Sequence, residues 1–163
     1  MTGWLYKMTI DELDARLIAA LRESPRVGLL EISRRLGVAR GTVQARLTKL
    51  ESRGVITGYG PEVDPAAMGY GIQAFVLLEL TQGRLAEATS VLEAVPEVVE
   101  VDAISGPQDM LCRLVARDTE HLQEIVNRIL ATAAIRRSTS YIVLSQQVKP
   151  RTGPLVEAAG RGR

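Results

Sequence analysis

Several kinds of side chain are scarce in this chain, and each scarcity excludes a class of protein. The 163 residues include one cysteine and one histidine. A single cysteine excludes an intrachain disulfide, and one cysteine with one histidine cannot supply a His/Cys metal site within one chain. Cys112 lies in an apolar run, which predicts a reduced and buried thiol. We therefore expect no metal and no other cofactor.

Long apolar runs are missing as well. No stretch approaches the ~20 consecutive apolar residues that a membrane-spanning helix needs. The N-terminal segment MTGWLYKM lacks the apolar centre of a secretory signal. The sequence therefore predicts a cytoplasmic protein with no membrane partner.

The net charge of +1 conceals an uneven distribution of charge. Ten cationic and six acidic residues give residues 1–60 a net charge of +4. Six cationic and twelve acidic residues give residues 61–148 a net charge of −6. A basic end and an acidic end in one chain indicate that only the first end meets nucleic acid.

Residues 29–54, LLEISRRLGVARGTVQARLTKLESRG, predict two short helices around a tight turn. Gly37 and Gly54 stand where left-handed residues commonly end helices. Before each glycine, apolar residues recur at helical spacing, first Leu29, Ile32 and Leu36, then Val43, Leu47 and Leu50. This layout is that of a helix-turn-helix, whose second helix lies in the DNA major groove.

The outward side of the second helix carries cations, amides and small residues. We predict that Arg40 and Gln44 read base edges and that Arg46 and Lys49 hold phosphates. Small residues would let the helix backbone lie deep in the groove. The residues predicted to contact double-stranded DNA are Arg40, Gly41, Thr42, Gln44, Ala45, Arg46, Thr48 and Lys49.

Two structural alternatives stand beside this interpretation. The segment could be an ordinary amphipathic helix with a solvated basic face, although the helix-turn-helix spacing favours DNA binding. Arg46 could instead form a salt bridge with Glu31 or Glu51.

The segments on either side complete a domain over residues 9–60. Thr9 and Glu12 fit a capping box, so a helix is expected to start there and to end at Ser24-Pro25. Val55 and Ile56, followed by turn residues, predict a short strand and hence a small wing. Residues 61–69 are rich in turn formers and are predicted to be a linker.

Residues 70–149 follow a different pattern. Strand-like segments at 72–80, 98–104, 110–116 and 138–145 are interrupted by helical segments at 85–92 and after a cap at Asp118 or Thr119. The order β-α-β-β-α-β predicts a ferredoxin-like sandwich, so the fold class is α+β, with a winged helix-turn-helix followed by this sandwich. Residues 150–163 are rich in Gly, Ala and Arg and are expected to be disordered.

The predicted sheet has four strands and only two helices, which can cover one face. Face-to-face dimerisation of two sheets would cover the other face and would supply two recognition helices for two half-sites. Several residues of one apolar set are expected on the uncovered face: Phe75, Leu77, Val99, Val101, Leu111 and Tyr141.

The chain resembles the leucine-responsive/asparagine-regulator (Lrp/AsnC) family of feast/famine regulators over residues 10–148. The resemblance rests on IDELDARLIAAL, on RLGVARGTVQARLTKLESRGVITGYGPEVDPAAMGY and on ISGPQDMLCRLVARD. The most specific run, R-x-x-x-L-E-x-x-G-x-I-x-G-Y, is preserved as Arg46, Leu50, Glu51, Gly54, Ile56, Gly58 and Tyr59. The resemblance implies a dimer, assembling further to a tetramer or an octamer, and a small-molecule effector, usually an amino acid, bound by the sandwich.

The resemblance also places the effector site. Family members carry a Gly-x-x-Asp turn near the effector, here Gly106 and Asp109, and Thr or Ser in the last strand, here Ser138 and Ser140. The predicted effector-binding residues are Gly106, Pro107, Gln108, Asp109, Met110, Ser138 and Ser140. The alternative is that the turn is only a tight β-hairpin, with Asp109 bonded to backbone N–H groups.

The sequence departs from the family pattern in three places. Ala39 replaces the usual Ser cap of the recognition helix, which weakens that helix start. Pro107-Gln108 replaces an acidic-aromatic pair, and Met110 stands where an aromatic residue is frequent. A stiff turn and an apolar wall at Met110 favour a ligand with an apolar or mixed side chain.

Three functions compete for this sequence. The first is a transcription regulator modulated by an amino acid or related metabolite. The second is an effector-independent architectural DNA-organising protein, which would bind DNA with little sequence preference. The third is an enzyme, because siroheme decarboxylases resemble this fold. Those enzymes need His and Arg around a tetrapyrrole, and this chain offers only His121, expected to be solvated, so no enzymatic activity is predicted.

Overall fold

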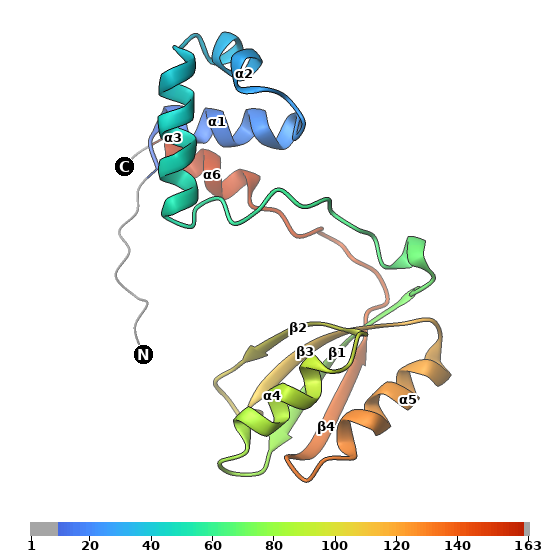
Figure 1. Cartoon of the computed structure of the whole chain (residues 1–163). Helices are drawn as coiled ribbons and strands as arrows, with labels where there is room; N and C mark the ends of the chain where they lie inside the picture. The colour runs from blue at the N-terminus through green and yellow to red at the C-terminus, as the bar shows by residue number, and fades with distance from the viewer. Residues whose placement is uncertain (1–9, 162–163) are drawn as a thin grey trace. The chain divides into compact units, whose positions relative to one another are not determined.

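The computed structural model of the chain describes residues 10–161 and divides into two compact units (Figure 1). The first unit combines the chain up to Pro61 with the chain from Val148 onward. The second unit is Glu62–Gln147. Within the described residues, no helix is both long and apolar enough to cross a membrane.

The first unit contains the predicted helix-turn-helix. Helix α1 (Glu12–Glu23) packs on α2 (Leu29–Leu36) and α3 (Arg40–Ser52) around an apolar core. Gly37 ends α2 in the left-handed region, with φ of 70°. The fully buried side chains of this core are Leu17, Ile32, Val43 and Leu50.

The start of α1 differs from the sequence prediction. Thr9 lies outside the described residues, and the N-cap is Asp11. The Asp11 side chain accepts the N–H of Asp14 at 2.9 Å, and the Asp14 side chain accepts the N–H of Asp11 at 3.2 Å. The capping box is therefore formed by two aspartates, and the predicted pair of Thr9 and Glu12 is wrong. An N-cap carboxylate satisfies the same free N–H groups as a threonine hydroxyl.

The predicted wing strand at Val55 and Ile56 is also wrong. Their backbone N–H groups donate to the carbonyl of Leu50 at 2.9 and 3.3 Å, and Gly54 has φ of 68°. These bonds close the end of α3, so the same N–H groups cannot join a strand ladder. No strand is assigned to residues 53–71 in the part of the chain that the structure describes, where a short 3₁₀ helix, η1 (Ala66–Met68), is the one regular element.

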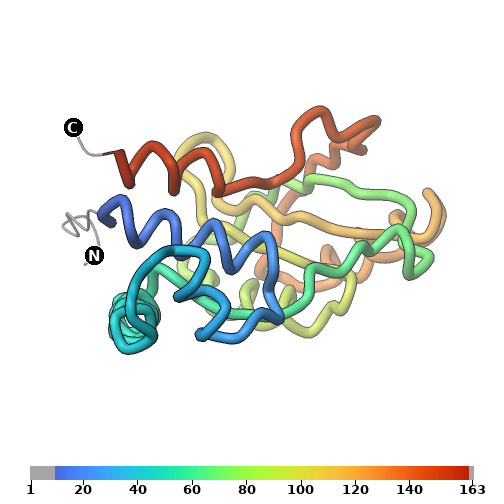
Figure 2. Tube along the Cα trace, turned by 90° about the horizontal axis from the view of Figure 1, so that it is seen from above, coloured from blue at the N-terminus to red at the C-terminus, as the bar shows by residue number. Residues whose placement is uncertain are grey.

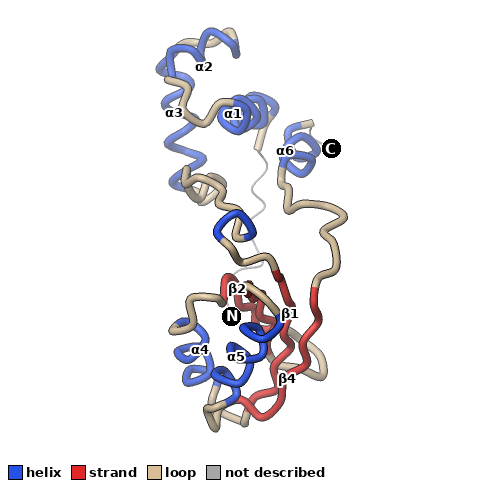
Figure 3. Tube along the Cα trace, turned by 90° about the vertical axis from the view of Figure 1, so that its right-hand side faces the viewer, coloured by secondary structure: helices blue, strands red, loops and turns tan. Residues whose placement is uncertain are grey.

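Residues 153–160 form a helix where the sequence predicts disorder. Helix α6 (Gly153–Gly160) lies beside α1, as Figures 2 and 3 show. Val156 of α6 packs against the helix-turn-helix core. The Gly and Ala content that predicts disorder instead permits close packing between two helices, and this tertiary contact overrides the weak local propensity.

The second unit is the predicted four-stranded α+β sandwich. Its elements are β1 (Ile72–Leu80), α4 (Leu85–Glu93), β2 (Val98–Ala103), β3 (Met110–Ala116), α5 (Thr119–Leu130) and β4 (Ile135–Ile142). The strand order is β2-β3-β1-β4, and all neighbours are antiparallel. Strand β4 begins and ends earlier than the predicted 138–145, because Ile135 is buried in the core and pairs with Leu80.

Helices α4 and α5 cover one face of the sheet (Figure 3). The pairs Phe75–Tyr141 and Leu77–Leu111 are aligned on the opposite face, as predicted for these four side chains. Val101, in contrast, pairs with the buried Cys112 and packs against the core under the helices. The expectation for Val101 is therefore wrong, because a register shift between Val98 and Glu100 changes the alternation of β2.

The one cysteine and the one histidine of the chain are both buried in this unit. Cys112 is a free, fully buried thiol, as predicted, and burial raises its pKa to about 11. His121 is also buried, so the expectation that it is solvated is wrong. Its Nδ1 accepts the N–H of Arg117 at 3.2 Å, and its Nε2 lies 3.3 Å from a carboxylate oxygen of Glu97. These partners satisfy both ring nitrogens inside the fold.

Candidate functional site

The exposed side of α3 is the candidate nucleic-acid interface. Val43, Leu47 and Leu50 face the core. Seven of the eight predicted DNA-contacting residues are exposed, namely Arg40, Gly41, Thr42, Gln44, Ala45, Thr48 and Lys49. The surface therefore combines two cations with an amide, two hydroxyls and two small residues, which suits phosphate and base-edge contacts.

The polar groups of this surface are largely uncommitted. Within the described residues, neither Arg40 nor Lys49 forms an ion pair. Gln44 donates to the hydroxyl of Thr48 at 3.4 Å, a long bond that a base edge could replace. Ala39 is the N-cap of α3 and makes no side-chain hydrogen bond, as the sequence predicts.

Arg46 differs from the other predicted DNA contacts because its guanidinium faces α1. Its Nη1 pairs with a carboxylate oxygen of Asp11 and lies 2.9 Å from Oδ1 of Asp14. The hydrogen bond from Arg46 holds the pKa of the Asp11 carboxyl below its ordinary value. Arg46 thus fastens the middle of α3 to the start of α1, and its use as a phosphate contact would break this cluster.

The partners of Arg46 are not those that the sequence suggests. Glu31 pairs with Arg34 and Arg35, and Glu51 accepts a hydrogen bond from Tyr59 at 2.7 Å. The salt-bridge alternative is therefore correct in kind and wrong in its partners. Sequence reasoning missed Asp11 and Asp14. Their i, i+3 spacing at a helix start was a signal for the capping box but not for the contact with α3.

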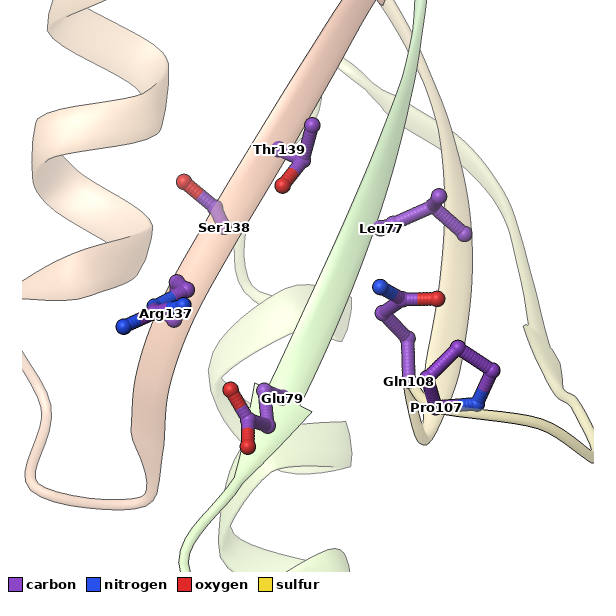
Figure 4. A pocket seen from close by; sticks show the side chains of 7 residues that line it. All are labelled: Leu77, Glu79, Pro107, Gln108, Arg137, Ser138 and Thr139. Atoms are coloured by element: carbon purple, nitrogen blue, oxygen red, sulfur yellow. The ribbon is translucent and has the colours of Figure 1, made fainter.

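A second candidate site lies on the sheet face that the helices leave uncovered. A cavity of about 230 Å³ opens between β1, β4 and the turn before β3 (Figure 4). Its lining residues are Leu77, Glu79, Pro107, Gln108, Arg137, Ser138 and Thr139. The predicted effector residues Pro107 and Gln108 are thus brought to one cavity. Ser138 also borders it, but Ser138 pairs with the buried Leu78, so its side chain is on the face of the sheet that the helices cover.

Met110 and Ser140 do not line this cavity, although the sequence predicts that they do. Met110 is 3% exposed and faces the core under the helices. Ser140 pairs with the buried Val76, whereas Thr139 pairs with Leu77 on the open face. Because side chains alternate across a strand, an error of one residue moves a prediction to the other face. Thr139 is the residue of this part of β4 that lines the cavity and that sequence reasoning missed.

Gly106 and Asp109 shape the turn and do not line the cavity. Gly106 has φ of 142°, a conformation that favours glycine. Asp109 Oδ2 accepts the N–H of Leu80 at 2.7 Å, and its own N–H donates to the carbonyl of Leu78 at 2.9 Å. The Asp109 side chain thus bonds a backbone N–H, as in the hairpin alternative, but this N–H belongs to β1 and not to the turn. These bonds fasten the turn to β1 and place Pro107 and Gln108 at the cavity.

The cavity combines both signs of charge with hydroxyl and amide groups. Glu79 and Arg137 are register partners on β1 and β4, and Figure 4 shows each on its strand. Glu79 pairs with Arg136, the neighbour of Arg137. Within the described residues, Arg137 forms no ion pair. Sequence reasoning missed Leu77, Glu79 and Arg137, because only the strand register places them beside the turn.

Comparison with known families identifies both units. The model for the AsnC-type helix-turn-helix domain matches residues 10–51, and the model for the Lrp/AsnC ligand binding domain matches residues 73–154. The transcriptional regulator FL11 of Pyrococcus horikoshii is 32% identical over 138 residues, which cover 85% of this chain and 91% of that protein.

Solved structures agree with these matches. E. coli AsnC superposes with a TM-score of 0.83 at 27% identity, covering 90% of this chain and 100% of that chain. A transcriptional regulator of Neisseria meningitidis in complex with L-Met shares the fold, with a TM-score of 0.77 at 24% identity, covering 89% of this chain and 96% of that chain. The chain therefore belongs to the Lrp/AsnC family of transcriptional regulators, with an N-terminal helix-turn-helix for DNA binding and a ligand-binding domain.

Proposed function

We propose that this chain is a sequence-specific DNA-binding regulator whose activity is modulated by an amino acid or related small metabolite. The observation that carries the proposal is the cavity at Arg137 and Glu79 on the open sheet face. A free amino acid carries a carboxylate and an ammonium group, and it needs a partner of opposite charge for each.

The lining residues suggest a role for each group. The Arg137 guanidinium and the Thr139 hydroxyl are suited to the ligand carboxylate. Glu79 keeps acceptor capacity beside its pair with Arg136 and can receive the ammonium. Leu77 and Pro107 offer an apolar wall to the ligand side chain. The L-Met complex of the Neisseria relative supports an amino acid as the ligand class, with an apolar side chain.

On the DNA side, the exposed residues of α3 carry the proposal. Arg40 and Gln44 read bases, and Lys49 holds a phosphate, with Gly41 and Ala45 allowing close approach of the backbone. The protein acts without catalysis, like the transcriptional regulators that it resembles. It forms a homodimer through the open sheet face, and this dimer assembles to a tetramer or an octamer.

A thermal-shift screen against the amino acids tests the ligand proposal. A ligand at 100 times its dissociation constant adds about 2.7 kcal/mol to the free energy of unfolding. The matched variants are Thr139→Val, which removes a hydroxyl from the cavity, and Ser140→Ala, which removes one from the next residue of the same strand. Thr139→Val is expected to weaken the stabilisation, and Ser140→Ala is expected to preserve it.

Two outcomes would contradict the proposal in different ways. Equal loss in Thr139→Val and Ser140→Ala would place the ligand elsewhere. Failure of every amino acid to stabilise the protein, together with equal affinity for selected and random DNA, would favour the architectural DNA-organising alternative.

A further inference from the structure

The C-terminal helix α6 runs antiparallel to α1 within the first unit. At one end, Arg22 of α1 donates to the hydroxyl of Thr152 at 2.6 Å, just before α6 begins. At the other end, Gly160 lies against the backbone of Asp11 and Glu12. Between these ends, Val156 packs on the helix-turn-helix core. The two helices are therefore in contact from the start of one to the end of the other.

Gly160 packs on α1 without room for a side chain. It is buried, and a Cβ added to it would lie nearer to the Cβ of Ala15 than two carbon atoms can approach. The backbone of Gly160 does not itself need glycine, because its φ is not positive. The neighbouring Ala159 is exposed. The close packing on Ala15 therefore leaves no room for a side chain at position 160, whereas position 159 has room for one.

The segment of α1 under Gly160 is the segment that holds the recognition helix. Asp11 and Asp14 both lie within residues 11–15, the segment that Gly160 contacts, and both pair with Arg46 of α3. Helix α3 has no side-chain N-cap at Ala39. Val43, Leu47 and Leu50 pack α3 into the core, and the pairs made by Arg46 add a polar link between α3 and the start of α1.

We propose that Gly160 and Ala15 are positioning residues for DNA recognition. Docking of α6 at this contact fixes the first turn of α1, and α1 fixes α3 through Arg46. The inference goes beyond ligand binding, because every contact that it uses lies within the first unit. Along the chain, α6 is reached from β4, which carries Arg137, Ser138 and Thr139 of the cavity. The last strand of the ligand-binding domain is thus continuous with a segment that positions the recognition helix.

The test compares Gly160→Val with Ala159→Val in the full-length protein. Both add bulk to the same turn of α6, but only Gly160→Val meets Ala15. The probe is a DNA duplex selected from a random library by the wild-type protein, measured without any added small molecule. Gly160→Val is expected to weaken binding at least about fivefold, and Ala159→Val less than about twofold, because overpacking shifts the helix backbone.

Two further measurements separate positioning from a general loss of stability. Gly160→Ala is a milder change that adds a single carbon. In the double variant Gly160→Ala/Ala15→Gly, the carbon that this Cβ would clash with is removed. The DNA affinity of the double variant is expected to equal that of Ala15→Gly alone. Asp11→Asn is expected to weaken DNA binding less in Gly160→Val than in the wild type, since both changes act on one chain of contacts.

Three results would overturn the inference. The first is wild-type affinity in Gly160→Val. The second is independent, multiplicative effects of Gly160→Val and Asp11→Asn. The third is that Ala15→Gly does not restore the DNA affinity of a Gly160→Ala protein whose circular dichroism shows that it keeps its helices. Because no ligand is added, failure of the ligand proposal would leave these measurements unaffected.

Discussion

At the scale of single residues, the partner of a side chain decides its role more than its type does. Arg40, Arg46 and Lys49 are all cations on one helix, and the sequence assigns each of them to DNA. The structure leaves Arg40 and Lys49 exposed, whereas Arg46 is held by two carboxylates of α1. A cation that is already paired within the fold offers little to a phosphate, so Arg46 acts by holding α3 in place.

The Asp11–Arg46 pair makes stability depend on pH in a defined direction. The pKa of Asp11 is lowered from its ordinary value near 3.8, chiefly by the hydrogen bond from Arg46. When the pKa of a carboxyl is lower in the native state than in the unfolded state, its ionised form stabilises the fold at a pH above the unfolded-state pKa. This contribution is lost as the pH falls through the native-state pKa. Between about pH 5 and about pH 2, the midpoint temperature of thermal unfolding should therefore fall more steeply with decreasing pH for the wild type than for Asp11→Asn.

Asp11→Asn is informative because asparagine still accepts the N-cap hydrogen bond but carries no charge. Glu12→Gln is the control, since Glu12 is an exposed neighbour that forms no ion pair within the described residues. If the midpoint temperature fell equally with pH in the wild type and in Asp11→Asn, the Asp11–Arg46 pair would contribute nothing measurable to the stability.

On the recognition helix, base reading and phosphate binding give different signatures. Gln44→Ala is expected to relax discrimination at one base position by about 1–3 kcal/mol, because only an amide aimed at a base edge carries sequence information. Lys49→Ala is expected to weaken all DNA sequences alike and to lower the slope of log affinity against log salt by about 1. Fluorescence anisotropy on selected and random duplexes at several salt concentrations measures both quantities. Equal losses of Gln44→Ala on both duplexes would refute base reading.

At the scale of helices and strands, the sequence predicts well wherever the local pattern and the tertiary packing agree. The bounds of β1 and β3 match their predicted ranges, because apolar strand formers there end at clear turn residues. The local pattern does not predict helix α6, because α6 packs on residues that are far away in the sequence, such as Ala15 against Gly160. The sequence predicts only part of the cavity. It shows the turn that carries Pro107 and Gln108, but it does not show the strand register that adds Glu79 and Arg137.

The weak start of α3 offers a stabilising substitution. Ala39 has the extended backbone of an N-cap, with φ of −64° and ψ of 145°, and makes no side-chain hydrogen bond. Ala39→Ser would supply an acceptor for a free N–H of the first turn, which is expected to add about 1 kcal/mol to the free energy of unfolding. Urea denaturation measures this change. Ala45→Ser, an exposed position inside the same helix, is the control and should not stabilise the protein.

At the scale of the whole molecule, the two units carry opposite charge. Fourteen cationic and seven acidic residues give the first unit a net charge of +7, and six cationic and twelve acidic residues give the second a net charge of −6. The residues after Val148 supply four of those cations and belong to the DNA-binding unit. The division of charge is therefore sharper than a single cut along the sequence suggests, and it directs DNA toward one unit.

The face of the sheet that α4 and α5 leave uncovered carries apolar side chains that a second copy of the chain could cover. Phe75 and Tyr141 are paired on it and are 37% and 56% exposed, with Leu77 and Leu111 beside them. An exposed apolar patch of this kind is typical of a surface that another subunit covers.

Phe75→Asp is therefore expected to dissociate the protein, because it would bury a carboxylate in the centre of the proposed dimer interface. Leu144→Asp is the matched control, since Leu144 is 95% exposed and lies after the sheet has ended. Light scattering coupled to gel filtration gives the mass of each full-length variant. We expect the Leu144→Asp protein to keep the oligomeric mass of the wild type and the Phe75→Asp protein to approach 17.7 kDa, the mass of one chain. A wild-type protein that elutes as a monomer, or a Phe75→Asp protein of unchanged mass, would show that copies of the chain do not assemble through this face.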